Sequence, residues 1–123
     1  MFARMLTRST AERSVANDII FKGYYMLIVN LQLKIKPEKR LEFSDWFNGI
    51  LPDTRSYNGC TEVNSCSVSD DSEVVEIISK WGSKDQYDAY LAWREATGVV
   101  AKLGEYVSAA PVFRFLTVDR QFE

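Results

Sequence analysis

The sequence predicts a single α+β domain of the ferredoxin-like class, with the element order β-α-β-β-α-β. Its 123 residues suit one hydrophobic core. Hydrophobic residues make up 46% of the chain and charged residues 26%, which is the balance of a globular protein rather than a disordered one. Segments with strand and helix periodicity follow one another in the order of a split β-α-β unit.

The first half of the domain reads as a strand, a helix and a turn. Residues 25–36 are apolar on both alternating faces at the start, as in a strand that is covered on both sides. Pro37 suits a first helical turn, and an apolar stripe at helical spacing follows it. The stripe consists of Phe43, Trp46, Phe47, Ile50 and Leu51. Pro52 is expected to end or kink this helix, and Asn58-Gly59 marks the next turn.

The second half supplies three strands and a long helix. Residues 60–69 form a polar, serine-rich strand, and residues 70–72 suit a hairpin connection into a strand over 73–81. Ser83 and Gln86 form a capping-box pattern that starts the second helix. Gly98 is expected to interrupt this helix before a shorter helical piece. Pro111 opens the last strand over 112–118.

Both long helices are expected to cover one face of the four-stranded sheet. The opposite face is apolar on the first, third and fourth strands, and no further element of the chain remains to cover it. An apolar face of this size is typical of an interface, and a second copy of the sheet is the simplest cover. The sequence therefore predicts a homodimer.

Residues 1–22 are expected to be a loosely ordered extension, and residues 23–123 are expected to form the domain.

The composition of the chain disfavours several classes of protein. No apolar run reaches the roughly 20 residues of a membrane span, and a net charge of −2 gives no reason to expect nucleic acid or an anionic membrane as partner. Cys60 and Cys66 lie too far apart along one strand to bridge, which favours a reducing, cytoplasmic setting. Their spacing matches no zinc site, and the chain contains no histidine.

Four segments carry a resemblance to a known family. They are Lys34-Ile35-Lys36-Pro37-Glu38, Asn58-Gly59-Cys60, Lys80-Trp81-Gly82-Ser83-Lys84 and the helical run from Tyr87 to Arg94. With these segments, residues 24–118 resemble the antibiotic-biosynthesis-monooxygenase-type domains of the dimeric α+β barrel superfamily. The resemblance implies a homodimer. It also implies a small aromatic or enolisable substrate that is oxygenated without metal, flavin or another cofactor.

The resemblance also assigns candidate catalytic residues. In the haem-degrading members, the site consists of an Asn on the first strand, a Trp at the end of the third strand and a His on the next helix. Asn30 and Trp81 match the first two, and the His has no counterpart. Haem degradation is therefore disfavoured, because the His supplies the axial iron ligand.

Further candidates come from the helix after Trp81. Tyr87, Tyr90 and Arg94 share one helix face and are predicted to bind substrate, since Tyr can donate a proton and Arg can hold an anion. The alternative interpretation is an amphipathic helix with aromatic core contacts and an Arg at its rim. Glu76 and Glu62 are candidates for a general base by strand position. The alternative function is a non-catalytic, ligand-binding or stress-associated dimer with the same pocket.

Overall fold

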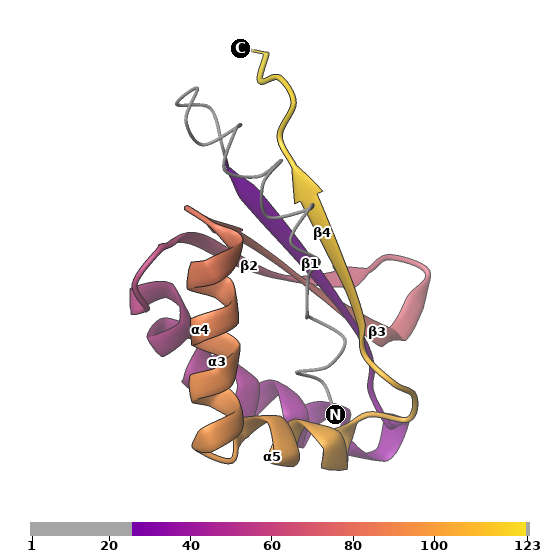
Figure 1. Cartoon of the computed structure of the whole chain (residues 1–123). Helices are drawn as coiled ribbons and strands as arrows, with labels where there is room; N and C mark the ends of the chain where they lie inside the picture. The colour runs from indigo at the N-terminus through magenta and orange to yellow at the C-terminus, as the bar shows by residue number, and fades with distance from the viewer. Residues whose placement is uncertain (1–25, 123) are drawn as a thin grey trace.

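The computed structural model describes residues 26–122, which form a four-stranded antiparallel sheet packed against helices (Figure 1). The strands are β1 (Leu27–Lys34), β2 (Cys60–Val68), β3 (Asp71–Trp81) and β4 (Val112–Thr117). Their order across the sheet is β2-β3-β1-β4, so the first and third strands are central. This topology confirms the predicted ferredoxin-like α+β fold.

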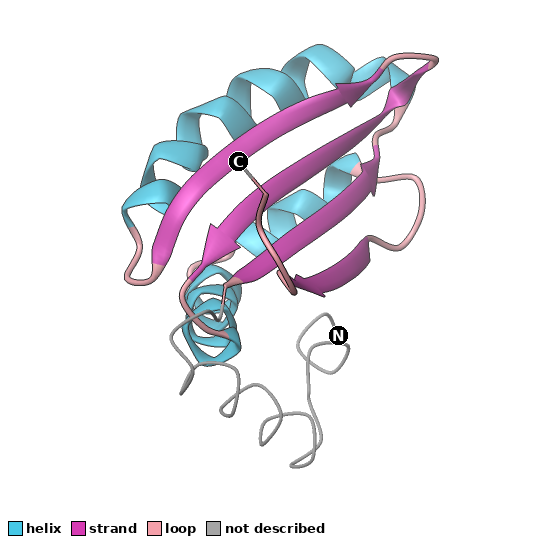
Figure 2. Cartoon of the chain, turned by 90° about the horizontal axis from the view of Figure 1, so that it is seen from above, coloured by secondary structure: helices cyan, strands magenta, loops and turns pink. Residues whose placement is uncertain are grey.

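The helices gather on one face of the sheet (Figure 2). They are the short 3-10 helix η1 (Pro37–Lys39), α3 (Arg40–Ser56), α4 (Lys84–Ala96) and α5 (Val99–Tyr106). Between sheet and helices the core has two parts. One joins α3 and α5 to the sheet through Leu33, Ile35, Phe43, Phe47, Val75, Ile77, Leu103 and Tyr106. The other joins α4 to the sheet through Leu27, Val29, Cys60, Trp81, Tyr87 and Leu91.

The pairing register determines which side chains face the helices. Leu27 lies opposite Trp81, and Leu33 lies opposite Val75, so these residues share the helix-covered face. The intervening residues point to the other side, because successive strand residues alternate. This helix-free face carries Ile28, Val74, Ile78, Val112 and Leu116, interspersed with polar side chains.

Two sequence signals act as predicted around α4. Ser83 Oγ accepts a hydrogen bond from the backbone N–H of Gln86 at 3.2 Å, so the N-cap is formed. Gly98 adopts a left-handed conformation with φ of 86°, which separates α4 from α5. A residue without a Cβ takes this conformation at little steric cost.

Pro52 does not end its helix, which was one of the two outcomes predicted for it. α3 continues through Pro52 to Ser56. A proline inside a helix removes one backbone hydrogen bond, but tertiary contacts hold the last turn in place. Thr54, two residues after the proline, is buried and hydrogen-bonded to α4.

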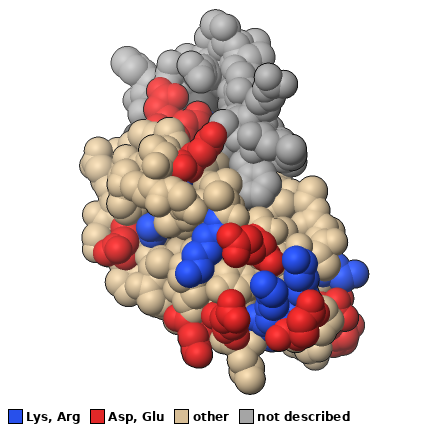
Figure 3. Space-filling model, turned by 90° about the horizontal axis from the view of Figure 1, so that it is seen from below, with Lys and Arg blue, Asp and Glu red and all other residues tan. Residues whose placement is uncertain are grey.

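One sequence prediction concerns residues that the structure does not describe. The predicted extension over residues 1–22 lies outside the described residues. None of the helices in residues 26–122 has the length and apolar character needed to cross a membrane. The face of the protein in Figure 3 shows acidic and basic side chains interspersed, without a patch of one sign.

Candidate functional site

An aromatic cluster lies where the end of β3 meets α4. Trp81 is the last residue of β3 and only 1% exposed. Its ring centroid is 5.2 Å from that of Tyr87 and 5.0 Å from that of Tyr90. Tyr57 packs against Trp81, and Phe115 of β4 packs against Tyr87. The rings of three predicted site residues, Trp81, Tyr87 and Tyr90, are therefore in contact with one another.

The Trp81 indole has its hydrogen bond within the sheet. Its Nε1 donates to Ser79 Oγ at 2.9 Å, and both side chains are buried. An indole has only this one donor. Trp81 thus contributes its apolar ring to the cluster, while its polar atom is already satisfied.

Tyr87 is a fully buried tyrosine of the cluster whose hydroxyl is still available. Its side chain is 3% exposed, and within residues 26–122 its hydroxyl has no hydrogen-bond partner. Burial, followed by the proximity of Tyr90 and Asp88, raises the pKa of Tyr87 above its ordinary value. The phenol therefore stays protonated at neutral pH and acts as a donor, not as a base.

Tyr90 and Arg94 take part in a polar network between α4 and α3. Arg94 is 4% exposed, and its Nε donates to the Tyr90 hydroxyl at 3.1 Å. Its Nη2 donates to the Ile50 carbonyl at 2.7 Å and to Thr54 Oγ1 at 3.0 Å. The hydroxyls of Thr54 and Tyr90 are 2.7 Å apart. Arg94 thus ties two helices together, a role that sequence reasoning did not find.

Asn30 lies apart from the other candidates. It pairs with Ile78, whereas Trp81 pairs with Leu27, so Asn30 and Trp81 point to opposite faces of the sheet. Asn30 Nδ2 donates to Glu76 Oε1 at 3.3 Å, and its buried Oδ1 has no partner in the described part of the chain. The structure does not bring the two predicted catalytic residues into one pocket.

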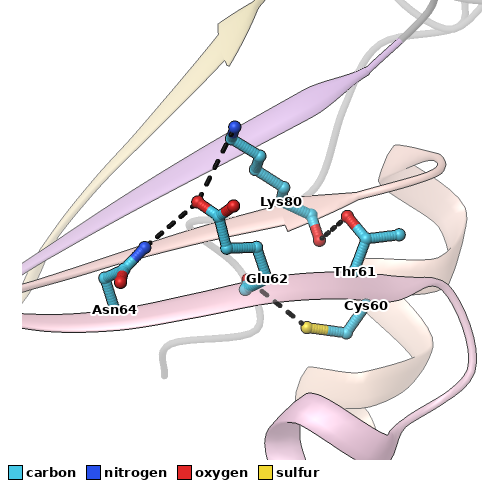
Figure 4. A network of polar contacts seen from close by, with 5 residues as sticks. All are labelled: Cys60, Thr61, Glu62, Asn64 and Lys80. Atoms are coloured by element: carbon cyan, nitrogen blue, oxygen red, sulfur yellow. Dashed lines mark hydrogen bonds and ion pairs between the residues drawn. The ribbon is translucent and has the colours of Figure 1, made fainter.

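The carboxylates considered as bases also lie away from the aromatic cluster. Glu76 pairs with Gln32 and is on the helix-free face with Asn30. Glu62 contacts Lys80 Nζ at 3.6 Å and accepts from Asn64 Nδ2 at 3.1 Å (Figure 4). Neither carboxylate points toward Tyr87, because both lie across the sheet from α4.

A groove that the sequence analysis missed lies elsewhere on the helix-covered side. It has a volume of about 190 Å³ and is lined by α3 and the β2-β3 edge of the sheet. The lining residues are Arg40, Phe43, Ser44, Phe47, Asn48, Ser65, Ser67 and Val75. The available signal was the pair of serines at alternate positions of β2, where a core-facing strand usually carries larger apolar residues.

No metal or thiol centre is evident in the part of the chain that the structure describes. No three His, Cys, Asp or Glu side chains of residues 26–122 are grouped so as to hold a metal ion. Cys60 and Cys66 are both free thiols. Burial raises the pKa of the Cys60 thiol, which disfavours the reactive thiolate.

The fold is shared with several solved structures. A conserved protein from Methanosarcina mazei Go1 is 16% identical with a TM-score of 0.71, covering 79% of this chain and 96% of that one. Rv0793 from Mycobacterium tuberculosis is 14% identical with a TM-score of 0.71, covering 80% and 99%. A structure named antibiotic biosynthesis monooxygenase is 19% identical with a TM-score of 0.66, covering 77% and 98%. At these identities the likeness shows the fold alone.

Sequence comparison supplies the family. No curated protein matches the chain with significant similarity. The family profile described as antibiotic biosynthesis monooxygenase matches residues 26–102, from the start of β1 into α5. This match spans more than half of the chain and includes Trp81, Tyr87 and Tyr90. The chain therefore belongs to the antibiotic biosynthesis monooxygenase family.

Proposed function

We propose that this protein is a cofactor-independent monooxygenase for a small aromatic or enolisable compound, with Tyr87 as its donor to developing negative charge. The observation that carries the proposal is the Tyr87 phenol. It is buried and protonated, and it lacks a hydrogen-bond partner within residues 26–122. Membership of the monooxygenase family supports the choice of reaction.

Cofactor-independent oxygenation requires few protein groups. The substrate loses a C–H proton to a water molecule, and the resulting carbanion or phenolate reduces O₂ by electron transfer. Recombination places O₂ on carbon as a peroxide anion, and protonation followed by loss of water converts CH₂ to C=O. The proposed role of Tyr87 is to hydrogen-bond the substrate oxygen as it gains charge, in surroundings from which Trp81 and Phe115 exclude water.

Oxygen uptake by the Tyr87→Phe variant tests this role. A hydrogen bond to a charged group contributes roughly 1.5–3 kcal/mol, so the turnover rate with an anthrone should fall about 10- to 100-fold. Tyr106→Phe is the matched control, because Tyr106 is equally buried but lies in the other part of the core. Equal uptake by the two variants and the unaltered protein would remove Tyr87 from the reaction.

A second candidate, a non-catalytic ligand-binding protein, is favoured by the separation of Asn30 from Trp81. The two predicted catalytic donors do not converge, and the Trp81 donor is already bonded to Ser79. If the unaltered protein consumes no oxygen with a varied aromatic panel but one of these compounds raises its melting temperature, this function replaces the first. Haem turnover is not proposed, since none of the 123 residues is a histidine.

We also propose that the helix-free face forms a homodimer contact. Val112 is 49% and Leu116 40% exposed there, beside half-buried Ile28 and Ile78. Light scattering after gel filtration should give a dimer at micromolar concentration. Leu116→Asp should weaken the dimer at least about tenfold, because it places a charge in an apolar contact. Leu41→Asp, a change at an exposed leucine on α3, should leave the dimer intact. A monomeric unaltered protein would exclude this interface.

A further inference from the structure

The groove between α3 and β2 is hollow because of the side chains that β2 presents to the helix. Ser65 pairs with Ile77, and Ser67 pairs with Val75, so both serines lie on the helix-covered face. A serine side chain is too short to reach α3, and the space above it stays open. Phe43 and Val75 line the groove as apolar walls.

The polar groups in this groove are mainly hydrogen-bond donors. Arg40, at the start of α3, contributes a guanidinium, and Asn48, two turns later, contributes an amide. Ser44 Oγ accepts a hydrogen bond from Arg40 Nη1 at 2.7 Å, which leaves its own O–H free to donate. Ser65 and Ser67 add two hydroxyls from the opposite wall.

Arg40 is held in place without being neutralised. Besides the bond to Ser44, its Nε donates to the Ser72 carbonyl at 3.3 Å. These two contacts fix the guanidinium from both ends, whereas its Nη2 has no hydrogen-bond partner among residues 26–122. In the same part of the chain, no carboxylate forms an ion pair with Arg40. A positioned guanidinium with a free Nη2 suits a planar or tetrahedral oxyanion.

We propose that this groove binds a small oxyanion, either inorganic phosphate or a short carboxylate, between Arg40 and the serines of β2. The volume of about 190 Å³ is below that of a pocket for a drug-sized ligand and suits a compound of a few non-hydrogen atoms. None of the residues that line the groove belongs to the aromatic cluster of Trp81 and Tyr87. The oxyanion site is therefore separate from the proposed oxygenation site and does not depend on it.

Titration of the full chain with inorganic phosphate and, separately, with acetate tests this inference. In NMR spectra, the backbone amide signals of Ser65 and Ser67 should shift with added ligand until the shift reaches a plateau. The Kd should be on the order of millimolar for so small a ligand. Saturation by phosphate alone identifies a phosphate site, and saturation by both identifies a general oxyanion site. If neither ligand gives a saturable shift, the proposal is wrong.

Three variants locate the binding. Arg40→Gln should weaken binding at least about tenfold, because it removes the charged fork but keeps a polar side chain. Ser67→Val should also weaken binding, since it fills the groove and removes a donor, and it leaves Arg40 in place should Arg40→Gln fold poorly. Lys39→Gln is the matched control: Lys39 neighbours Arg40 in sequence, yet its ammonium lies over the Tyr106 ring at 5.7 Å. Equal weakening by Lys39→Gln would show general attraction to positive charge and overturn the site.

Discussion

Replacing Trp81 by alanine is expected to lower the free energy of unfolding by about 3–5 kcal/mol. The indole is 1% exposed and fills the space between the end of β3 and α4. Its removal leaves a cavity lined by Tyr57, Tyr87 and Tyr90, and it also deprives the buried Ser79 hydroxyl of the donor that it accepts from. Chemical denaturation followed by circular dichroism measures the loss.

Two further variants serve as comparisons for Trp81→Ala. Trp81→Phe keeps most of the ring volume and should lose less stability than Trp81→Ala. Trp93→Ala removes a half-buried ring that stacks on Tyr57, and it should likewise cost less. If Trp81→Ala retains its stability but loses oxygen uptake, Trp81 lines an open substrate cavity and does not fill the core.

Replacing Arg94 by methionine is expected to cost about 2–3 kcal/mol of unfolding free energy. Three charge-assisted hydrogen bonds are lost, each contributing roughly 1.5–3 kcal/mol. Part of this loss is offset, because a buried guanidinium without a carboxylate partner in residues 26–122 is itself costly. Tyr90 and Thr54 also remain hydrogen-bonded to each other. Methionine keeps the apolar stem, so the measurement reports mainly the polar contacts.

Whether Arg94→Met lowers or raises the free energy of unfolding distinguishes a structural role of Arg94 from a substrate-binding role. Arg120→Met is the control, because Arg120 is exposed and lies after β4, and it should change stability by less than about 0.5 kcal/mol. Destabilisation by Arg94→Met alone confirms that Arg94 joins α3 to α4. An Arg94→Met protein that is more stable than the unaltered one would instead support the predicted substrate-binding role, in which the buried charge awaits an anionic ligand.

Local signals were sufficient to predict the elements of this fold. The N-cap at Ser83 and the helix interruption at Gly98 depend on a few neighbouring residues, and both formed as predicted. The order of strands and helices follows from hydrophobic periodicity, which is also a short-range property. The family resemblance drew on the same short motifs, and the matching profile over residues 26–102 confirms it.

Only the tertiary structure decided how the candidate residues are arranged. Asn30 and Trp81 lie on opposite faces because of the pairing register between β1 and β3, which a one-residue shift would reverse. Arg94 meets Ile50 and Thr54 across 40 or more residues of sequence, and no local pattern encodes that contact. Pro52 stays within α3, where contacts from α4 hold the helix end. Periodicity assigns a residue to a face of its own element, but the packing of distant elements determines what that face meets.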